Sequence, residues 1–373
     1  MKKFDNLLVY SIRDYIDSTL LIISLLFLQV FSVQSIQNEK RFEFCGAKKD
    51  LDVKDKSFFK SKHGAQSLQN SVKPGLDLAF FGDYDLISRL QTVNLDYAKF
   101  FRYLIKTIDL RFNEPKLRQI FGGKIEFRIV FSEIANGSLW LASNRELKLS
   151  LSTATSYALA HPQAFSSHWD AAIFLTGSNL HISKEDSVRR ADVLGVAFVG
   201  SLCSKAVLCE VHDFDSIWVL LHELGHAFGA HHDSEVGCED TTSIMSDSVG
   251  VFKTFWSDCA IKQFQDNMPE TSQCLYNQKL GVVPDGFHMP EDLPGQVFTD
   301  LDVCRMGKSV NIIPAIRESC RKYTCQLRWF QWTTLALLEG TPCNNGGICC
   351  AGTCKSVEDC AKFYGVSSLN IKP

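Results

Sequence analysis

The sequence has no long run of like charge. Only 22% of its 373 residues are charged, and 39 basic residues nearly balance 42 acidic ones, for a formal net charge of -3. Such a balance does not suggest a protein that binds nucleic acid or another polyanion. The sequence has no internal repeat. It also lacks paired Cys-x-x-Cys units, which argues against a zinc ribbon. The hydrophobic share of 45% indicates a packed globular protein with a large core.

Cysteine, by contrast, is abundant and unevenly placed. Of the 14 cysteines, Cys45 stands alone and all others lie between Cys203 and Cys360. So many cysteines favour an exported protein with disulfides. The dense stretch CNNGGICCAGTC, residues 343–354, predicts loops held together by disulfides. Asn136 begins the sequon Asn-Gly-Ser, a candidate site of N-glycosylation.

The N-terminus resembles a secretory leader. Two lysines open the chain, and an apolar run from Leu20 to Val33 is too short for a comfortable membrane span. We therefore predict a signal peptide over residues 1–35, cleaved near Val33 and Ser35, and a secreted protein. The alternative is an uncleaved type II membrane anchor. Residues 36–72 are polar and lysine-rich, which is typical of a linker or a short pro-segment.

Strands and helices alternate through the following part of the chain. Alternating or continuous apolar residues predict strands at residues 75–86, 124–134, 171–177 and 194–200. Apolar residues at helical spacing predict helices at residues 97–112, after a cap at Asn94, and at 145–159 and 257–267. A further helix, opening with the apolar stretch SIWVLL, is expected to carry the histidines that follow it. This alternation predicts an α/β fold built on one sheet. The stretch VVPDGFHMPEDLPG then marks a domain boundary.

The stretch LLHELGHAFGAHHD, Leu220 to Asp233, has the spacing of a metal site. His222 and His226 are four residues apart, so a helix places both imidazoles on one face, where they can share a zinc ion. Glu223 then lies beside the metal as a base and not necessarily on it. A bare His-Glu-x-x-His pattern also occurs in unrelated chains without function.

Gly229 extends this pattern to a third ligand. A glycine can adopt positive φ and turn the chain back, so that His232 reaches the metal, whereas continued helix would carry it away. Three protein ligands leave a fourth position open, as in catalytic zinc sites. The neighbouring His231 is the alternative third ligand, although adjacent residues of an extended chain point to opposite sides.

With Met245 following in SIMSDS, the pattern HExxHxxGxxH resembles the metzincins. Because Asp233 follows the third histidine, the chain most resembles the adamalysin or reprolysin group, and within it ADAMTS-like and arthropod salivary or venom-type members. The resemblance implies an α/β metzincin (zincin-like) catalytic domain at residues 73–283, with one mixed sheet, an active-site helix and a Met-turn. A small disulfide-rich module, disintegrin-like and cysteine-rich, would occupy residues 284–373.

The same resemblance assigns further roles. Met245 would form the turn beneath the zinc, residues 194–203 the edge strand that pairs with an extended peptide, and residues 246–256 the wall of a substrate pocket. Four counterparts of a calcium site supply oxygen ligands: Asp77, Asp170, the carbonyl of Cys274, and Asn277. Asp77 stands where the family usually has the longer Glu, and each acid taken alone is also an ordinary surface carboxylate.

Several cysteine assignments also come from the resemblance. It implies the disulfides Cys203–Cys274 and Cys238–Cys259. Cys45 resembles a cysteine switch, in which a pro-segment thiolate occupies the open zinc position and keeps the enzyme latent. The alternative is that Cys45 is a disulfide partner, because Cys209 has no upstream cysteine in the catalytic domain with which to pair.

The resulting functional hypothesis is a secreted zinc metalloendopeptidase. It would hydrolyse peptide bonds of extracellular matrix or plasma proteins through a zinc-activated water, with Glu223 as general base. We expect a monomer that binds neither nucleic acid nor a membrane. One rival is a catalytically silent secreted protein that binds through its cysteine-rich tail. The other is a structural zinc protein in which Cys45 supplies a fourth ligand.

Overall fold

The computed structural model describes residues 73–161, 169–182, 194–238, 242–247, 253–271, 273–276, 281–306, 312–327, 330–334 and 336–369. All of them belong to one compact unit. The predicted signal peptide and pro-segment, with Cys45, lie outside the described residues, as does Asn277. Within the described part, no helix has the length and apolar character that crossing a membrane requires.

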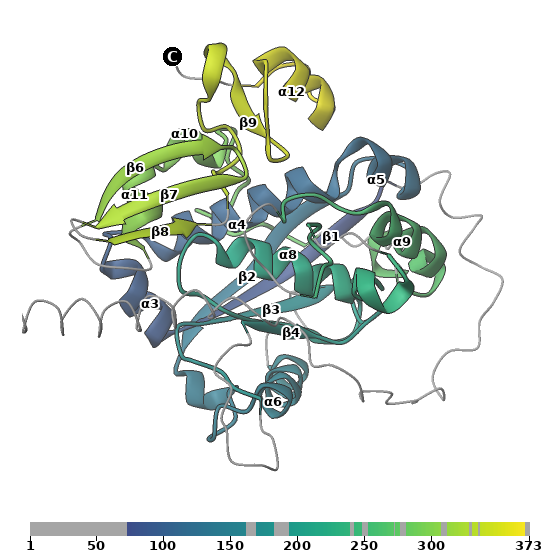
Figure 1. Ribbon diagram of the computed structural model, residues 1–373. Helices are drawn as coiled ribbons and strands as arrows, with labels where there is room; N and C mark the ends of the chain where they lie inside the picture. The colour runs from purple at the N-terminus through teal and green to yellow at the C-terminus, as the bar shows by residue number, and fades with distance from the viewer. Residues whose placement is uncertain are drawn as a thin grey trace, which may run out of the picture. The chain divides into compact units, whose positions relative to one another are not determined.

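A five-stranded mixed sheet forms the centre of the described residues from 73 to 276 (Figure 1). Its strands are β1 (Gly75–Asp83), β2 (Glu126–Ala135), β3 (Ala171–Thr176), β4 (Gly195–Ala197) and β5 (Ala206–Glu210). They lie in the order β2-β1-β3-β5-β4, and only the edge strand β4 runs antiparallel to its neighbour. The predicted fold class, one mixed sheet with an active-site helix, is thereby confirmed.

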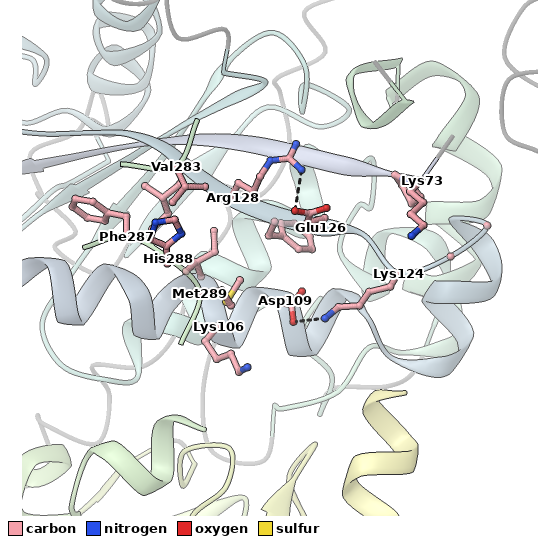
Figure 2. Close-up of a pocket in the computed structure, with 16 residues that line it drawn as sticks. Lys73, Lys106, Asp109, Lys124, Glu126, Arg128, Val283, Phe287, His288 and Met289 are labelled. Atoms are coloured by element: carbon pink, nitrogen blue, oxygen red, sulfur yellow. Dashed lines mark ion pairs between the residues drawn. The ribbon is translucent and has the colours of Figure 1, made fainter. Parts of the chain in front are cut away.

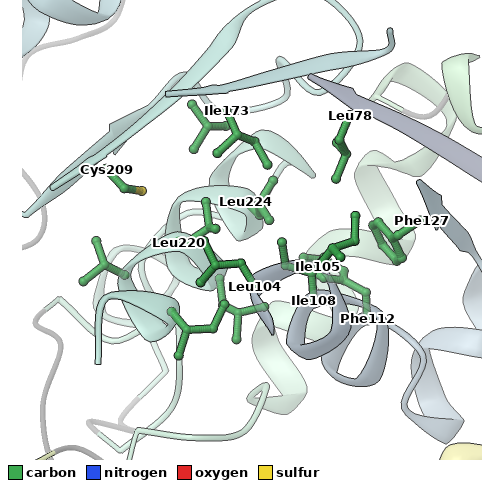
Figure 3. Packing of buried hydrophobic residues seen from close by; sticks show 14 of the residues in the cluster. Leu78, Leu104, Ile105, Ile108, Phe112, Phe127, Ile173, Cys209, Leu220 and Leu224 are labelled. Atoms are coloured by element: carbon green, nitrogen blue, oxygen red, sulfur yellow. The ribbon is translucent and has the colours of Figure 1, made fainter. Parts of the chain in front are cut away.

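Helices cover both faces of this sheet. They are α3 (Tyr84–Gln91), α4 (Tyr97–Phe112), α5 (Pro115–Ile120), α6 (Leu147–Ala160), α8 (Ser216–Ala227) and α9 (Asp258–Thr271). One face packs through Leu78 and Phe80 against α4 and α8, and Figure 3 shows Leu220 and Leu224 of α8 among these core side chains. The opposite face packs through Phe81 against α6. The strand β1 is therefore buried on both sides, which explains its continuous apolar sequence.

Two predicted details of the first elements are wrong. The strand predicted to reach residue 86 ends at Asp83, because this carboxylate accepts a hydrogen bond from the Leu86 N–H and caps α3. The cap of α4 is Asp96, which accepts from the Lys99 N–H, whereas Asn94 adopts a positive φ of 55° in the preceding turn. The strand β5 was not predicted from the sequence.

The C-terminal module, here the described residues from 284 to 369, has more regular structure than the predicted loops. Its helices are α10 (Pro294–Val297), α11 (Asp300–Arg305) and α12 (Val357–Tyr364); its strands are β6 (Ile312–Ser319), β7 (Lys322–Leu327), β8 (Phe330–Thr334), β9 (Ile348–Cys350) and β10 (Thr353–Lys355). Four disulfides join them: Cys304–Cys325, Cys320–Cys349, Cys343–Cys354 and Cys350–Cys360. The disulfides supply much of the stability that the small hydrophobic core of the module cannot provide.

A buried charge cluster joins this module to α4. The fully buried guanidinium of Arg111 lies 2.9 Å from Glu114 and 3.4 Å from Glu339 of the module. Glu339 also accepts hydrogen bonds from the Tyr364 hydroxyl at 2.7 Å and from the Ala351 N–H. Burial raises the pKa of Glu114 to about 7, because Arg111 only partly offsets the loss of water and Glu339 adds repulsion.

This pKa predicts how stability depends on pH. The pKa of Glu114 in the folded protein exceeds its ordinary value of 4.5, so the stability linked to protonated Glu114 is complete below that value and is lost as pH rises through about 7. We expect Glu114→Gln to gain roughly 1 to 3 kcal/mol over the wild type between about pH 5 and pH 8, measured by urea unfolding. The exposed Glu358→Gln is the control; an equal gain there would contradict the prediction.

Candidate metal centre

The three predicted ligand histidines meet at one buried point. Helix α8 carries His222 and His226 on one face, and His232 follows the helix. Their Nε2 atoms lie 3.1 Å apart between His222 and His226, and 3.2 Å apart between His232 and each of the others. All three side chains are at most 9% exposed. Three imidazole nitrogens facing one another are a donor set suited to zinc.

The outer ring nitrogens fix the tautomers of two histidines. His222 donates from Nδ1 to the Ile244 carbonyl at 2.6 Å, and His226 donates from Nδ1 to the Ala230 carbonyl at 2.7 Å. With the proton on Nδ1, each Nε2 presents a lone pair to the centre. Burial, followed by the neighbouring histidines, lowers the pKa of His226 to about 3 and that of His222 well below its ordinary value. The imidazoles are therefore neutral at physiological pH, as metal ligands must be.

Gly229 turns the chain after α8 as the sequence predicts. It has a φ of +100°, and Asn267 of α9 donates to its carbonyl at 2.6 Å. The turn brings His232 to the centre and leaves the side chain of His231 about half exposed, beside Glu235. The structure thus selects His232 over His231 as the third histidine.

Met245 and Asp233 support the centre from below. Met245 is fully buried, and a Cβ on Gly225 would lie only 2.4 Å from its sulfur, so the helix needs a glycine at this position. The Met245 carbonyl accepts from the Asp233 N–H at 2.9 Å. The buried Asp233 carboxylate in turn accepts hydrogen bonds from the hydroxyls of Ser243 and Ser257. Asp233 therefore joins three parts of the chain beneath the histidines.

Glu223 of α8 lies against the edge strand β4. Its carboxylate is buried, and a Cβ on Gly195 of β4 would lie 2.8 Å from its Cγ. Burial raises the pKa of Glu223 to about 8, and a hydrogen bond with the Ala197 backbone opposes this rise. A carboxylate with a pKa this close to neutrality is suited to exchanging protons with a substrate.

One residue of the candidate calcium site, Asp77, forms an ion pair with Arg128. Asp77 and Asp170 lie together, since the Asp170 carboxylate accepts from the Asp77 N–H at 2.9 Å. However, one oxygen of the buried Asp77 carboxylate bonds to Arg128 Nε at 2.5 Å, and the other accepts from the Gly281 N–H at 2.6 Å. Cys274 lies in the adjoining 3-10 helix η4 (Gln273–Tyr276). Calcium binding here stays a prediction.

A cavity of about 800 Å³ lies away from the histidines, along the start of β2, α4 and residues 283–289. Figure 2 shows two ion pairs among its lining side chains: Lys124 lies 3.2 Å from Asp109, and Arg128 lies 3.4 Å from Glu126. Lys73, Lys106 and His288 also line the cavity.

The remaining predicted residues are placed as follows. The structure joins Cys203 to Cys274 and Cys238 to Cys259, the pairs that the resemblance implies. Cys209 lies in β5 with its side chain in the core (Figure 3). Asn136 is exposed and begins the short 3-10 helix η2 (Gly137–Leu139), where its side chain accepts from the Ser138 N–H. Its glycosylation stays a prediction.

Sequence reasoning missed the groups that hold the histidines. The carbonyls of Ile244 and Ala230 orient two imidazoles, and Gly195 makes room for Glu223. Backbone carbonyls carry no signal in a sequence. The glycines Gly195 and Gly225 were the only available hint, since a glycine inside a strand or helix often marks a close approach.

Comparison with known proteins agrees with this geometry. Residues 146–279 match the family model described as Reprolysin (M12B) family zinc metalloprotease. The human protein "A disintegrin and metalloproteinase with thrombospondin motifs 15" is 28% identical over 217 residues, which cover 52% of this chain and 21% of that protein. Its mouse relative with "thrombospondin motifs 1" is 26% identical over 222 residues, with 52% and 21% coverage.

A protein of Caenorhabditis elegans, "A disintegrin and metalloproteinase with thrombospondin motifs adt-1", is 28% identical over 203 residues, which cover 50% of this chain and 14% of that protein. The chain thus spans about a fifth or less of the length of these relatives. A solved "Structure of a chaperone-substrate complex" has a TM-score of only 0.37 at 13% identity, over 56% of this chain and 35% of that one. The chain contains a reprolysin (M12B) metalloprotease domain with an intact histidine triad.

The role of Gly229 can be tested by substitution. In Gly229→Ala, an alanine would have to adopt a φ of +100°, which is strained for a residue with a side chain, and its Cβ would lie 2.8 Å from the Asn267 Cβ. The turn to His232 must therefore distort. We expect a loss of roughly 2 kcal/mol or more in stability and weaker zinc binding. Gly237→Ala is the matched control, because Gly237 also has positive φ but no atom within 4 Å of the new Cβ. Thermal unfolding measures the stability of the two variants, and their zinc content measures zinc binding. Equal losses in Gly229→Ala and Gly237→Ala would refute a special role of Gly229.

The calcium set can be tested through Arg128. Because Arg128 neutralises the buried Asp77, we expect a calcium chelator to shift the wild-type unfolding temperature by less than about 2 °C, equivalent to under about 1 kcal/mol. Arg128→Gln leaves Asp77 without its cation, so added calcium should stabilise this variant more than the wild type. A strong calcium dependence of the wild type would show that calcium displaces Arg128.

Proposed function

We propose that this chain is a secreted zinc-dependent endopeptidase that cleaves extracellular proteins, with Glu223 as its general base. The observation that carries the proposal is the meeting of His222, His226 and His232 at one buried point, with the buried Glu223 next to them. A protein that only binds partners has no physical need for such a carboxylate. A structural zinc site also needs a fourth protein ligand.

Zinc, when bound by these histidines, supplies a Lewis acid that polarises a peptide carbonyl and acidifies water. Glu223 takes the proton of the attacking water through its carboxylate and later delivers it to the leaving amine nitrogen. Its burial serves both steps, because a raised pKa lets the same group accept and release a proton near neutral pH.

The position of β4 supports an extended peptide as substrate. β4 is the antiparallel edge strand of the sheet and lies directly beside Glu223. The free edge of a strand can pair with the backbone of an extended peptide, which would then run past the metal centre. Such recognition suits cleavage within a chain.

The cysteines support an extracellular setting. Six disulfides in the described residues, including four in the C-terminal module, form in oxidising compartments. The proposal also includes export by the predicted signal peptide, matrix or plasma proteins as substrates, and latency through Cys45.

Removal of residues before Lys73 should activate the enzyme if Cys45 acts as a switch, and should unfold it if Cys45 is a structural ligand.

The decisive variant is Glu223→Gln. It removes the base without removing a histidine, so we expect full zinc content and a loss of roughly 10² to 10⁴-fold in cleavage of a casein substrate. Glu358→Gln, which changes an exposed acid of α12 in the C-terminal module, is the control and should keep wild-type activity. Wild-type rates in Glu223→Gln would refute the mechanism, and a wild type that binds zinc but cleaves nothing would favour the silent binding protein.

A further inference from the structure

A chain of hydrogen bonds leads from the metal centre to residues 254–256. His222 donates from Nδ1 to the Ile244 carbonyl at 2.6 Å, and the Ile244 N–H donates to the Phe255 carbonyl at 2.8 Å. Ile244 thus orients the imidazole through its carbonyl and is itself held by Phe255 through its N–H. The position of the His222 ring therefore depends on where residues 254–256 lie.

Arg111 holds this segment from two sides. Its guanidinium donates from Nη2 to the Thr254 carbonyl, while its own carbonyl accepts from the Trp256 indole N–H at 2.9 Å. Trp256 in turn packs on the active-site helix, where a Cβ on Gly225 would lie 3.1 Å from the ring. Arg111 itself is fully buried, so its charge needs a buried counter-charge.

Glu114 lies 2.9 Å from the guanidinium, and the C-terminal module supplies a second buried counter-charge. Glu339, only 4% exposed, lies 3.4 Å from Arg111 Nη1 and is fixed by the Ala351 N–H and the Tyr364 hydroxyl. The module also contacts the segment directly, since a Cβ on Gly352 would lie 2.2 Å from the Thr254 hydroxyl oxygen. The 254–256 segment is therefore enclosed between α4 and the module.

We propose that Glu339 and Arg111 are positioning residues for His222, so that the C-terminal module completes the metal centre. Glu339 keeps the guanidinium in place, the guanidinium holds Thr254, and Phe255 and Ile244 pass this constraint to the imidazole. Partners that orient a metal-binding histidine through its outer nitrogen set both its tautomer and its metal affinity. The inference rests on the proposed function only in taking the metal to be zinc.

The test is the zinc affinity of Glu339→Gln in the full chain, measured by competition with a chromophoric chelator. Loss of a direct outer partner typically weakens metal binding about 10 to 100-fold, so we expect about tenfold for this more distant residue. Two controls should stay within about twofold of the wild type. Asp258→Asn removes an acid from an exposed ion pair, and Val357→Ala weakens the module core without a contact to Glu339.

A second variant keeps the charges and disturbs the same segment. Gly352→Ala pushes on Thr254, and it should also weaken zinc binding, by several-fold. The double variant Arg111→Met with Glu339→Gln should lose less affinity than the sum of the two single losses, because both residues act along one path. Wild-type zinc affinity in both Glu339→Gln and Gly352→Ala, or a loss in Val357→Ala as large as in Glu339→Gln, would overturn the inference.

The readout separates this inference from the proposed function. If the wild type binds zinc and cleaves no protein while Glu339→Gln weakens zinc binding, the endopeptidase proposal fails and the positioning role stands. If the wild type cleaves and Glu339→Gln binds zinc like the wild type, the positioning role fails and the endopeptidase proposal stands.

Discussion

A metal centre built from three imidazoles requires rings that are neutral and that each present a lone pair. For His222 and His226, burial meets the first condition by disfavouring the charged ring, and the carbonyls of Ile244 and Ala230 meet the second by accepting the Nδ1 protons. Each of these carbonyls must in turn be held. Much of the surrounding structure can be understood as the means of holding them.

The helix α8 supplies the rigid half of the centre. It is buried along its whole length between the sheet and α4, so the spacing of His222 and His226 is fixed by packing as well as by the helix itself. The other half lies beyond α8, in the turn at Gly229, the short 3-10 helix η3 (Asp233–Val236) and the described residues 242–247 and 253–256, and it is fixed by polar contacts. Asp233 ties the third histidine to Ser243 and Ser257, and Arg111 ties residues 254–256 to the module.

Local patterns predicted the elements whose sequence has a clear period. The helix at 97–112 and the active-site helix lie where apolar spacing placed them, and the fold class followed from the alternation of strands and helices. The strand β5 was missed because its five residues, AVLCE, are too short to show a period. The boundary at Asp83 was missed because a capping carboxylate at the end of a buried strand resembles an ordinary turn residue.

The sequence by itself determined the ligand chemistry: the spacing of His222 and His226, the base between them, and the glycine that returns the chain to His232. These depend on contacts within a dozen residues, where helical geometry and the freedom of φ at glycine decide the outcome. The tertiary structure alone decided what holds the ligands in place. Glu339 lies 228 residues from Arg111 along the chain, and no local rule relates two charges that meet only because burial forces each to find a partner.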